Sequence, residues 1–517
     1  MFDQTFRNIA DVVREHAAAR PHQAALVQGD RLLTFSELDA LMDRVAVALQ
    51  RDGVRAGAVI ALCGSTTPQQ AALFLGGLRA GALVAPLAPS VTSATFASML
   101  RDADARLLFV DAAAAALVPT DFKPPCIALE GGAPGTPVDD WLAAPGTRPL
   151  PVTVKPESPF NLIYSSGTTG TPKGIVQPHV MRWMHTLRGA PYGYGPDAVT
   201  VLATPLYSNT TLVAFFPALG LGGTVVLMAK FDARDYLALA ERHRATHTML
   251  VPVQYQRIMA LPNFSSHNLS SFRMKFSTSA PFPATLKADV LARWPGGLIE
   301  FYGMTEGGAT FILEAHRHSD KLHTVGRPAE GHDVRLIDDQ AHEVAIGGAG
   351  EIVGHSPTMM TGYHNQPRQT REAEWYAPDG KRFIRTGDVG RFDADGFLTL
   401  FDRKKDMIIS GGFNIYSSDL EAQLREHAAV DEAAVVGVPS TQWGETPVAF
   451  VVQRAGNSIP AAALREWMNA RVGKTQRLAD VVCVDELPRN ALGKVLKREL
   501  RRRYVIEHAR GFQEETR

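Results

Sequence analysis

Apolar residues near the start of the chain recur at helical spacing. A first helix is predicted within residues 1–20, with Phe6, Ile9, Val12 and Val13 on its inner side. A second is predicted from Thr34, because Thr34 and Glu37 have the spacing of a capping box, and it would run up to Gly53. Both helices are amphipathic and would pack on a common core.

Short apolar runs follow, separated by stretches of helical pattern. They are Val59–Leu62, Leu83–Leu87, Leu107–Val110, Thr224–Met228 and Met249–Val253. Continuous apolar runs of this length between helices are typical of parallel strands that are buried on both faces. The pattern therefore predicts a large α/β domain.

The pattern changes after Gly350 to short strands separated by polar turns, as in a small β-subdomain. The charged run 402–406 then precedes a capped helix from Ser418, with Glu421 three residues later. Beyond it we expect strands at 433–438, 448–452 and 481–484 and a helix at 461–472. The predicted fold is α/β: a large N-terminal domain of layered α/β sheets with a small β-subdomain (1–402), a hinge, and a small mobile α+β C-terminal domain (403–517).

Composition narrows the class of partner. The 517 residues include 53 Lys+Arg and 53 Asp+Glu, so nothing favours nucleic acid or an anionic membrane as the main partner. Cys63, Cys126 and Cys483 lie far apart and are predicted to be buried thiols in a reducing compartment. We find no signal-peptide pattern and no apolar tract that could span a bilayer, so we expect a cytoplasmic protein.

One stretch, YSSGTTGTPKGIVQPH at 164–179, is suited to a polyphosphate. Its glycines allow close backbone approach, its hydroxyls can bind oxyanions, and Lys173 adds a positive charge. It is not a Walker A loop, because Pro172 precedes the lysine and Gly174 follows it. Taken alone it could also be an ordinary flexible loop. The expected phosphate-binding residues are Ser165, Ser166, Gly167, Thr168, Thr169, Gly170 and Lys173.

Three more motifs follow in order: FYGMTE at 301–306, RTGD at 385–388 and PRNALGK at 488–494. With YSSGTTGTPKG they make the chain resemble, over essentially its whole length, the adenylate-forming superfamily of acyl-CoA synthetases, peptide-synthetase adenylation domains and luciferases. The resemblance implies formation of an acyl adenylate from a carboxylic acid and ATP.

Such a reaction sets clear chemical needs. A carboxylate that attacks the α-phosphate meets strong charge repulsion, so catalysis depends on positioning and on neutralising charge. Glu306 is the candidate hard-oxygen ligand for Mg²⁺, and Asp388 is an acceptor-only carboxylate suited to ribose hydroxyls.

The resemblance assigns further roles. It implies that Thr305 binds the α-phosphate, Tyr302 stacks on adenine, Arg403 assists Asp388, and Lys494 is the catalytic lysine of adenylation. It places the hinge at Lys405 and the pantetheine tunnel beside Gly411 and Gly412. The C-terminal domain would rotate between the two half-reactions.

The acyl pocket is expected at Tyr207, Ser208, Asn209, Ser279, Ala280 and Gly303. Many acyl-CoA synthetases have a gating histidine where this chain has Ser208, which puts that gating role in doubt. The segment 204–211 offers no carboxylate for an amino acid's ammonium group. Small polar residues here favour an aryl, arylpropenoate or medium-chain acid.

Two functions remain open. The first is a free-standing acid:CoA ligase that uses ATP, Mg²⁺ and coenzyme A on a small carboxylic acid. The second is an enzyme that loads the acid onto the phosphopantetheine of a carrier protein. The chain continues for about 20 residues past Lys494 without a carrier domain, which favours the ligase. Homo-oligomerisation is left open.

Overall fold

A computed structural model describes residues 5–165, 172–403, 406–410, 413–440, 442–473, 476–490 and 493–514. The side chains at 165, 402, 403, 413, 414 and 509–514 are outside this description. Packing divides the chain into two compact units. Unit 1 comprises residues 1–334 and 354–384, and unit 2 comprises 335–353 and 385–517.

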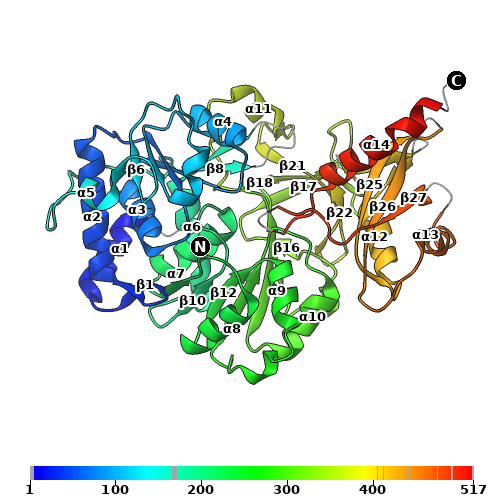
Figure 1. Cartoon of the computed structure of the whole chain (residues 1–517), viewed down its shortest axis with the longest axis horizontal. Helices are drawn as coiled ribbons and strands as arrows, with labels where there is room; N and C mark the ends of the chain where they lie inside the picture. The colour runs from blue at the N-terminus through cyan, green and yellow to red at the C-terminus, as the bar shows by residue number, and fades with distance from the viewer. Residues whose placement is uncertain are drawn as a thin grey trace. The chain divides into compact units, whose positions relative to one another are not determined.

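The first sheet of unit 1 has nine strands in the order β16-β15-β14-β13-β12-β10-β11-β1-β2 (Figure 1). In this order they are β16 (Arg327–Pro328), β15 (Thr310–Glu314), β14 (Gly297–Gly303), β13 (Met274–Ser277), β12 (His247–Leu250), β10 (Val199–Leu202), β11 (Thr224–Leu227), β1 (Ala24–Gln28) and β2 (Arg31–Thr34). The run from β14 to β1 is parallel. The turn after β14 carries the FYGMTE motif to the antiparallel strand β15.

The second sheet of unit 1 has eight strands in the order β19-β9-β8-β4-β3-β5-β6-β7. They are β19 (Gly362–Tyr363), β9 (Lys173–Pro178), β8 (Pro159–Ser165), β4 (Leu83–Leu87), β3 (Val59–Cys63), β5 (Leu107–Val110), β6 (Cys126–Ala128) and β7 (Thr136–Pro137). Strands β8 and β9 pair antiparallel, so the predicted phosphate loop connects the two strands of a hairpin.

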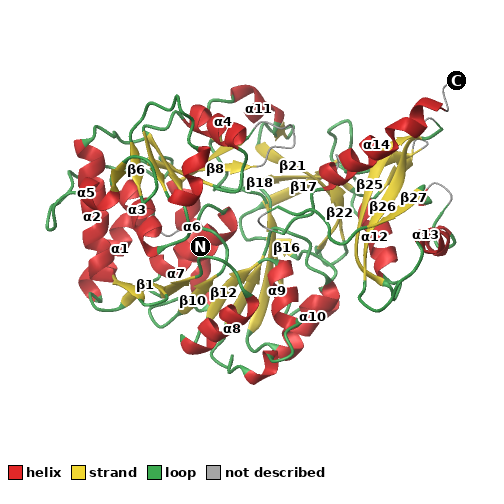
Figure 2. Cartoon of the chain, in the orientation of Figure 1, coloured by secondary structure: helices red, strands yellow, loops and turns green. Residues whose placement is uncertain are grey.

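Helices lie between these sheets and on their outer faces. Figure 2 shows α8 and α9 beside β12 of the first sheet, with α10 next to α9. The helices of unit 1 are α1 (Ile9–Ala19), α2 (Phe35–Arg51), α3 (Pro68–Arg79), α4 (Ser93–Ala103), α5 (Val138–Trp141), α6 (His179–Gly189), α7 (Asn209–Gly220), α8 (Ala233–Arg242), α9 (Pro252–Met259), α10 (Ala284–Arg293) and α11 (Pro367–Glu372). The main core cluster joins side chains of α2, α3 and α7 to strands of both sheets, so these helices form the layer between them.

Most predicted strands of this unit are confirmed, and one is wrong in part. Strands β3, β4, β5 and β11 agree with their predicted runs to within one residue. The run Met249–Val253 is divided, because β12 ends at Leu250 and α9 begins at Pro252. Proline suits the first turn of a helix, and the Gln254 side chain accepts a 3.0 Å hydrogen bond from the Val251 amide just before it.

The predicted capping box at the start of α2 is confirmed. The Glu37 amide donates to the Thr34 hydroxyl at 3.2 Å, and the Glu37 carboxylate accepts from the Thr34 amide at 2.8 Å. The bond from the Thr34 amide first, and then a 2.9 Å bond from the Thr34 hydroxyl to the same carboxylate, lower the pKa of Glu37.

Thr34→Ala is therefore expected to lower the free energy of unfolding by about 1 kcal/mol, because an N-terminal amide of α2 loses its acceptor. Urea denaturation followed by circular dichroism measures the change. The matched substitution Thr147→Ala, on an exposed loop hydroxyl outside any helix cap, should change stability less. Equal losses in the two variants would contradict the capping argument.

The chain passes between the units within β17 (Asp333–Ile337), β18 (Gly350–His355) and β21 (Arg382–Phe392). These strands form a third sheet in the order β17-β18-β21-β20, with β22 beside β21. Its remaining strands are β20 (Glu374–Tyr376) and β22 (Leu398–Arg403). The small β-subdomain expected after Gly350 corresponds to this sheet. The functional boundary expected at 402/403 stays a prediction.

A fourth sheet, in unit 2, has the order β24-β23-β26-β25, with β27 beside β26. Its elements are β23 (Ile408–Ser410), β24 (Phe413–Ile415), α12 (Ser417–Arg425), β25 (Val430–Ser440), β26 (Gly444–Gln453), α13 (Ala461–Asn469), β27 (Asp480–Cys483) and α14 (Lys497–Glu514). Two apolar clusters hold the helices on this sheet, and one of them includes Leu500 and Tyr504 of α14. The predicted strands and the 461–472 helix are present, whereas α14 was not predicted.

Two predictions in unit 2 are wrong. Ser418 does not cap α12, because its hydroxyl donates to the Phe401 carbonyl, and Glu421 instead accepts from the Val435 amide at 2.9 Å. Long-range partners thus replace the local capping box. Cys483, the last residue of β27, is exposed rather than buried, and Cys126 of unit 1 is only half-buried, although all three cysteines are free thiols.

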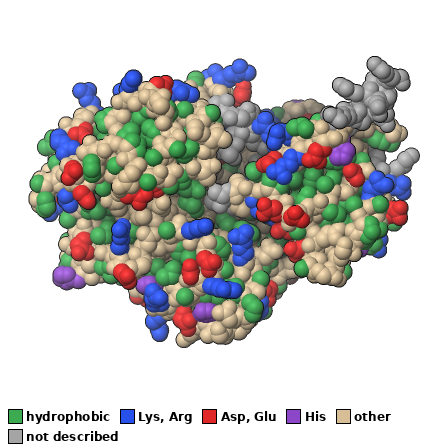
Figure 3. All heavy atoms as spheres, viewed as in Figure 1, with side chains coloured by type: hydrophobic (Ala, Val, Ile, Leu, Met, Phe, Trp, Pro, Cys, Tyr) green, Lys and Arg blue, Asp and Glu red, His purple; other side chains and the backbone are tan. Residues whose placement is uncertain are grey.

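Acidic and basic side chains are interspersed on the face of the molecule in Figure 3, in keeping with the balanced charge. Within the described part of the chain, no helix combines the length and the hydropathy that a bilayer crossing requires.

Candidate active site

The phosphate loop leaves and re-enters the second sheet at neighbouring positions. Ser165 at the end of β8 pairs with Lys173 at the start of β9. Ser166, Gly167, Thr168, Thr169 and Gly170 lie outside the described residues. The hairpin therefore fixes both ends of the loop that carries them.

Glu306 and Lys173 are joined through a tyrosine that the sequence did not single out. The Tyr363 hydroxyl donates to Oε1 of Glu306 at 2.9 Å, and the Lys173 ammonium lies 5.0 Å from the centre of the Tyr363 ring. Tyr363 belongs to β19 and pairs with Ile175 of β9. Burial first, and then the Glu306 charge, raise the pKa of this phenol, so it stays a hydrogen-bond donor.

The turn after β14 needs glycine at two positions. Gly307 and Gly308 have φ of +79° and +77°, and a Cβ on Gly308 would lie 2.5 Å from the Gly354 carbonyl oxygen. Backbone bonds fix the turn, since the Met360 amide donates to the Glu306 carbonyl at 2.7 Å. The Gln177 side chain donates to the Thr305 carbonyl at 2.6 Å. Thr305 and Glu306 therefore sit in a rigid segment.

The segment expected at the acyl pocket begins α7. The Ser208 hydroxyl is buried and accepts a 3.2 Å hydrogen bond from the Thr210 amide, so it caps the helix. The Thr210 hydroxyl is hydrogen-bonded to Ser279, which has φ of +80°. Tyr207 is hydrogen-bonded to Ser90, and burial raises the pKa of its phenol. Thr210 and Ser279 thus tie two predicted pocket segments together.

The other pocket positions lie nearby in the first sheet. Gly303 ends β14, and a Cβ there would lie 2.9 Å from the Ala309 carbonyl oxygen. Ala280 follows Ser279 in the loop after β13 and is partly exposed. Tyr302 is half-buried and packs on Phe311 of β15, with ring centres 5.6 Å apart.

Unit 2 carries the remaining predicted residues. Asp388 of β21 pairs with Arg403 of β22 across the antiparallel ladder, so the two residues expected at the ribose are direct neighbours. Lys494 follows Gly493, whose φ is +77°, and the Lys494 amide donates to the Asn490 side chain at 2.9 Å. Backbone bonds from Gly493 to Asn490 and from Asn490 to Lys494, each of 2.9 Å, also hold the backbone at this lysine. Lys405, Gly411 and Gly412 lie outside the described residues.

Two family models match this chain. The model described as AMP-binding enzyme matches residues 13–364, and the model described as AMP-binding enzyme C-terminal domain matches residues 419–494. The chain belongs to the AMP-binding enzyme family. The resemblance seen in the sequence motifs is thereby confirmed.

Relatives of this AMP-binding enzyme extend over nearly its full length. It is 32% identical to an indoleacetate–CoA ligase of Aromatoleum aromaticum, over 95% of this chain and 97% of the relative. It is 34% identical to a feruloyl-CoA synthase of an Amycolatopsis species, over 94% and 97% of the two chains. The crystal structure of ATP-bound MatB from Rhodopseudomonas palustris matches with a TM-score of 0.86 and 28% identity, over 96% of this chain and 99% of that one. The predicted α/β architecture and enzyme class are confirmed.

Three residues near the motifs were missed at the level of sequence. Tyr363, Gln177 and Arg182 all contact predicted site residues, yet Tyr363 is 57 positions from Glu306 and Gln177 is 128 positions from Thr305. No local pattern marks Tyr363 or Arg182, and Gln177 lies within the stretch 164–179 but had no predicted role. A polar glutamine in a strand and an arginine in a helix otherwise read as solvent-facing residues.

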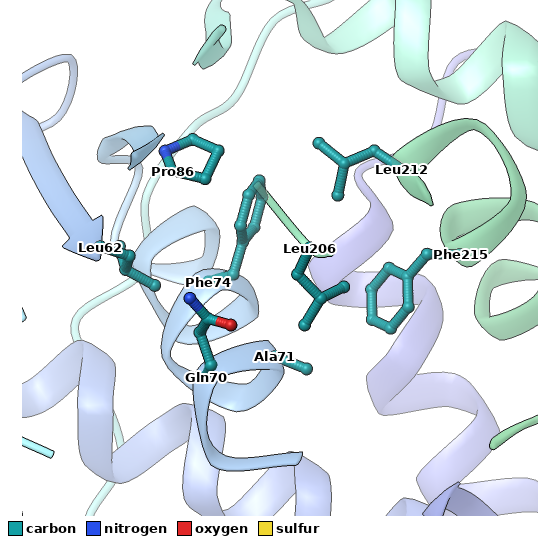
Figure 4. Close-up of a pocket in the computed structure, with 8 residues that line it drawn as sticks. All are labelled: Leu62, Gln70, Ala71, Phe74, Pro86, Leu206, Leu212 and Phe215. Carbon is teal, nitrogen blue, oxygen red and sulfur yellow. The ribbon is translucent and has the colours of Figure 1, made fainter. Parts of the chain in front are cut away.

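A small apolar cavity of this AMP-binding enzyme lies beside the start of α7 (Figure 4). It is lined by Leu62, Gln70, Ala71, Phe74, Pro86, Leu206, Leu212 and Phe215. None of these residues is among those predicted to bind ATP or the acid. The cavity therefore provides an apolar surface next to the segment Tyr207–Thr211. It provides no chemically reactive side chain.

Proposed function

We propose that this enzyme is an ATP-dependent carboxylic acid:CoA ligase. A carboxylate oxygen of the acid attacks the α-phosphorus of ATP, and pyrophosphate leaves with the electrons of the broken P–O bond. The CoA thiolate then attacks the carbonyl carbon of the acyl adenylate, and AMP leaves. The grouping of Glu306 and Lys173 around Tyr363, next to the Thr305 turn, supports this chemistry most directly.

Unit 1 would neutralise phosphate charge. Lys173 carries a fixed positive charge at the end of the phosphate hairpin, and the Thr305 hydroxyl lies in the turn that Gln177 holds. The Glu306 carboxylate fits Mg²⁺, which favours one or two carboxylates together with phosphate oxygens. Bound there, Mg²⁺ would offset negative charge on the phosphates. Tyr363 orients the carboxylate by binding one of its oxygens.

Unit 2 would supply the ribose contacts and the catalytic lysine. Asp388 would accept hydrogen bonds from ribose hydroxyls, with Arg403 beside it in the ladder. Lys494 would bridge carboxylate and phosphate oxygens in the first half-reaction. Rotation about Lys405 would then withdraw it and bring Gly411 and Gly412 to the pantetheine arm.

The acid is proposed to be an aryl, arylpropenoate or medium-chain acid. The similarity to ligases named for indoleacetate and ferulate supports the aromatic classes. The hydroxyl-rich contact between Thr210 and Ser279 supports a substrate with some polarity. One methylene is worth only about 1–3 kcal/mol in such a pocket, so activity across several related acids is expected.

The partners in this proposal are the acid, ATP and CoA, with homo-oligomerisation left open. A cytoplasmic location is part of the proposal, and three free thiols support a reducing compartment.

Asp388→Ala is expected to raise the KM for ATP about 10- to 100-fold, the size of a charge-assisted hydrogen bond of about 1.5–3 kcal/mol. Initial rates at varied ATP and saturating acid measure this change. Asp395→Ala, in the exposed turn between the same two strands, should leave the KM for ATP unchanged. An unaltered KM in Asp388→Ala would remove Asp388 from the ribose site.

The proposed function is tested by pyrophosphate release over a panel of aryl, arylpropenoate, short-, medium- and long-chain acids, with and without CoA. Acyl-CoA identified by mass, formed only when CoA is present, is the expected result. Adenylate without thioester would instead favour a carrier-protein phosphopantetheine as acceptor. No pyrophosphate with any acid would contradict the proposal.

A further inference from the structure

Arg182 of α6 is a fully buried guanidinium inside unit 1. Its Nε donates to the Asn161 side-chain oxygen at 2.9 Å, and its Nη2 donates to Gln177 and to Asn209, the latter at 2.8 Å. All three acceptors are neutral amides. Arg182 has no carboxylate partner among the described residues, and its buried Nη1 has no acceptor there.

This arrangement is costly for a purely structural residue. A buried charge without an opposite charge loses hydration that neutral amides replace only in part. Burial lowers the pKa of Arg182 to about 9, so the side chain still carries its charge at neutral pH. Arg182 therefore places a buried positive charge in unit 1 that no described carboxylate neutralises.

The same bonds fix the orientation of Asn209. Its Oδ1 accepts from Arg182 at 2.8 Å and from the Gln177 amide at 3.4 Å, so Oδ1 must face them and Nδ2 must face the other way. Asn209 is partly exposed, and its Nδ2 donates to no acceptor within the described ranges. The two N–H groups of the Asn209 side chain, at the start of α7, therefore point away from Arg182 and Gln177.

The Asn209 amide lies beside the reacting groups. The Gln177 amide nitrogen that contacts Asn209 also donates to the Thr305 carbonyl at 2.6 Å. Asn209 follows Ser208, whose hydroxyl is occupied in capping α7. The helix N-terminus adds a further favourable potential for an anion.

We propose that Asn209 donates a hydrogen bond to the carboxylate of the acid, and that Arg182 is the positioning residue that orients this amide and supplies the opposite charge. This inference rests on the proposed function and deepens it. It assigns carboxylate binding to an asparagine–arginine pair in a chain with Ser208 at the position of the gating histidine. In the second half-reaction, the same N–H would stabilise negative charge on the acyl oxygen.

Asn209→Asp separates this role from a structural one. The aspartate has the same size, pairs with Arg182 and suits the first turn of α7, so the melting temperature should stay unchanged or rise. The substitution removes the N–H donors of Asn209 and places a negative charge next to the negatively charged acid. The KM for the acid should therefore rise at least about 10- to 100-fold. The KM for ATP should change less than about twofold. Arg182→Met should also raise the KM for the acid.

Asn263→Asp makes the same change of charge on an exposed loop and serves as the control. The wild-type enzyme must first release pyrophosphate with a given acid, and its failure to do so would count against the proposed function alone. With an active wild type, an unchanged KM for the acid in Asn209→Asp would overturn the inference. Equal increases in the KM values for acid and ATP would also overturn it, because they would indicate a general disturbance of the site.

Discussion

Lys494→Ala is expected to lower acyl-adenylate formation at least about 10²- to 10³-fold, because the transition state loses a positive charge between carboxylate and phosphate oxygens. Thioester formation from a supplied acyl adenylate should be largely retained, since the lysine acts only in the first half-reaction. Pyrophosphate release measures the first step, and acyl-CoA production from synthetic acyl adenylate measures the second.

Lys497→Ala is the matched control. Lys497 is three residues further on, and its ammonium lies 2.8 Å from a Glu421 carboxylate oxygen, so its loss should lower stability but spare adenylation. Equal loss of both half-reactions in Lys494→Ala would refute the proposed rotation of the C-terminal domain.

Glu306→Gln is expected to produce the second large effect. The amide keeps an oxygen for the Tyr363 hydroxyl but loses the negative charge that Mg²⁺ requires, so the rate of adenylation should fall about 10²-fold or more. The Mg²⁺ concentration for half-maximal rate should rise as well. Titration of Mg²⁺ at fixed ATP measures both.

Tyr363→Phe offers a finer test of the same group. It removes the hydroxyl but keeps the ring beside the Lys173 ammonium, so we expect a smaller rise in the Mg²⁺ requirement. Glu300→Gln is the control for the carboxylate, since Glu300 lies on β14, the strand just before the Glu306 turn, and forms a buried ion pair with Lys287. It should lower stability without changing the Mg²⁺ titration. The same Mg²⁺ requirement in all three variants and the wild type would exclude Glu306 as a metal ligand.

The fold could be predicted from the sequence where the local residue pattern matches the burial of the element. Buried strands such as β3 and β4 have continuous apolar runs, and the capping box of α2 needs only residues three positions apart. The boundary between β12 and α9 was missed, because the apolar run continues across it and only Pro252 marks the change. The prediction that Ser418 caps α12 is wrong for another reason. Its hydroxyl donates to the carbonyl of Phe401, which is not a neighbour in sequence.

The residues of the candidate site also fall into a group that could be predicted from the sequence and a group that could not. Motif residues such as Glu306 and Asp388 could be predicted because chemistry and order in the chain mark them. Tyr363 and Arg182 could not, since their roles arise from tertiary contacts: Tyr363 of β19 binds Glu306 in the turn after β14, and Arg182 of α6 binds Asn209 of α7. A buried polar residue has no periodic signature, and only its tertiary partners distinguish it from a surface residue.

In the proposed reaction the acid is activated through its own oxygen as an acyl adenylate. Acid labelled with ¹⁸O in the carboxylate, turned over with ATP and CoA, tests it most directly through the mass of the released nucleotide and phosphates. The expected products are AMP carrying one ¹⁸O and unlabelled pyrophosphate. Unlabelled AMP, or label in inorganic phosphate with ADP as the nucleotide product, would contradict it.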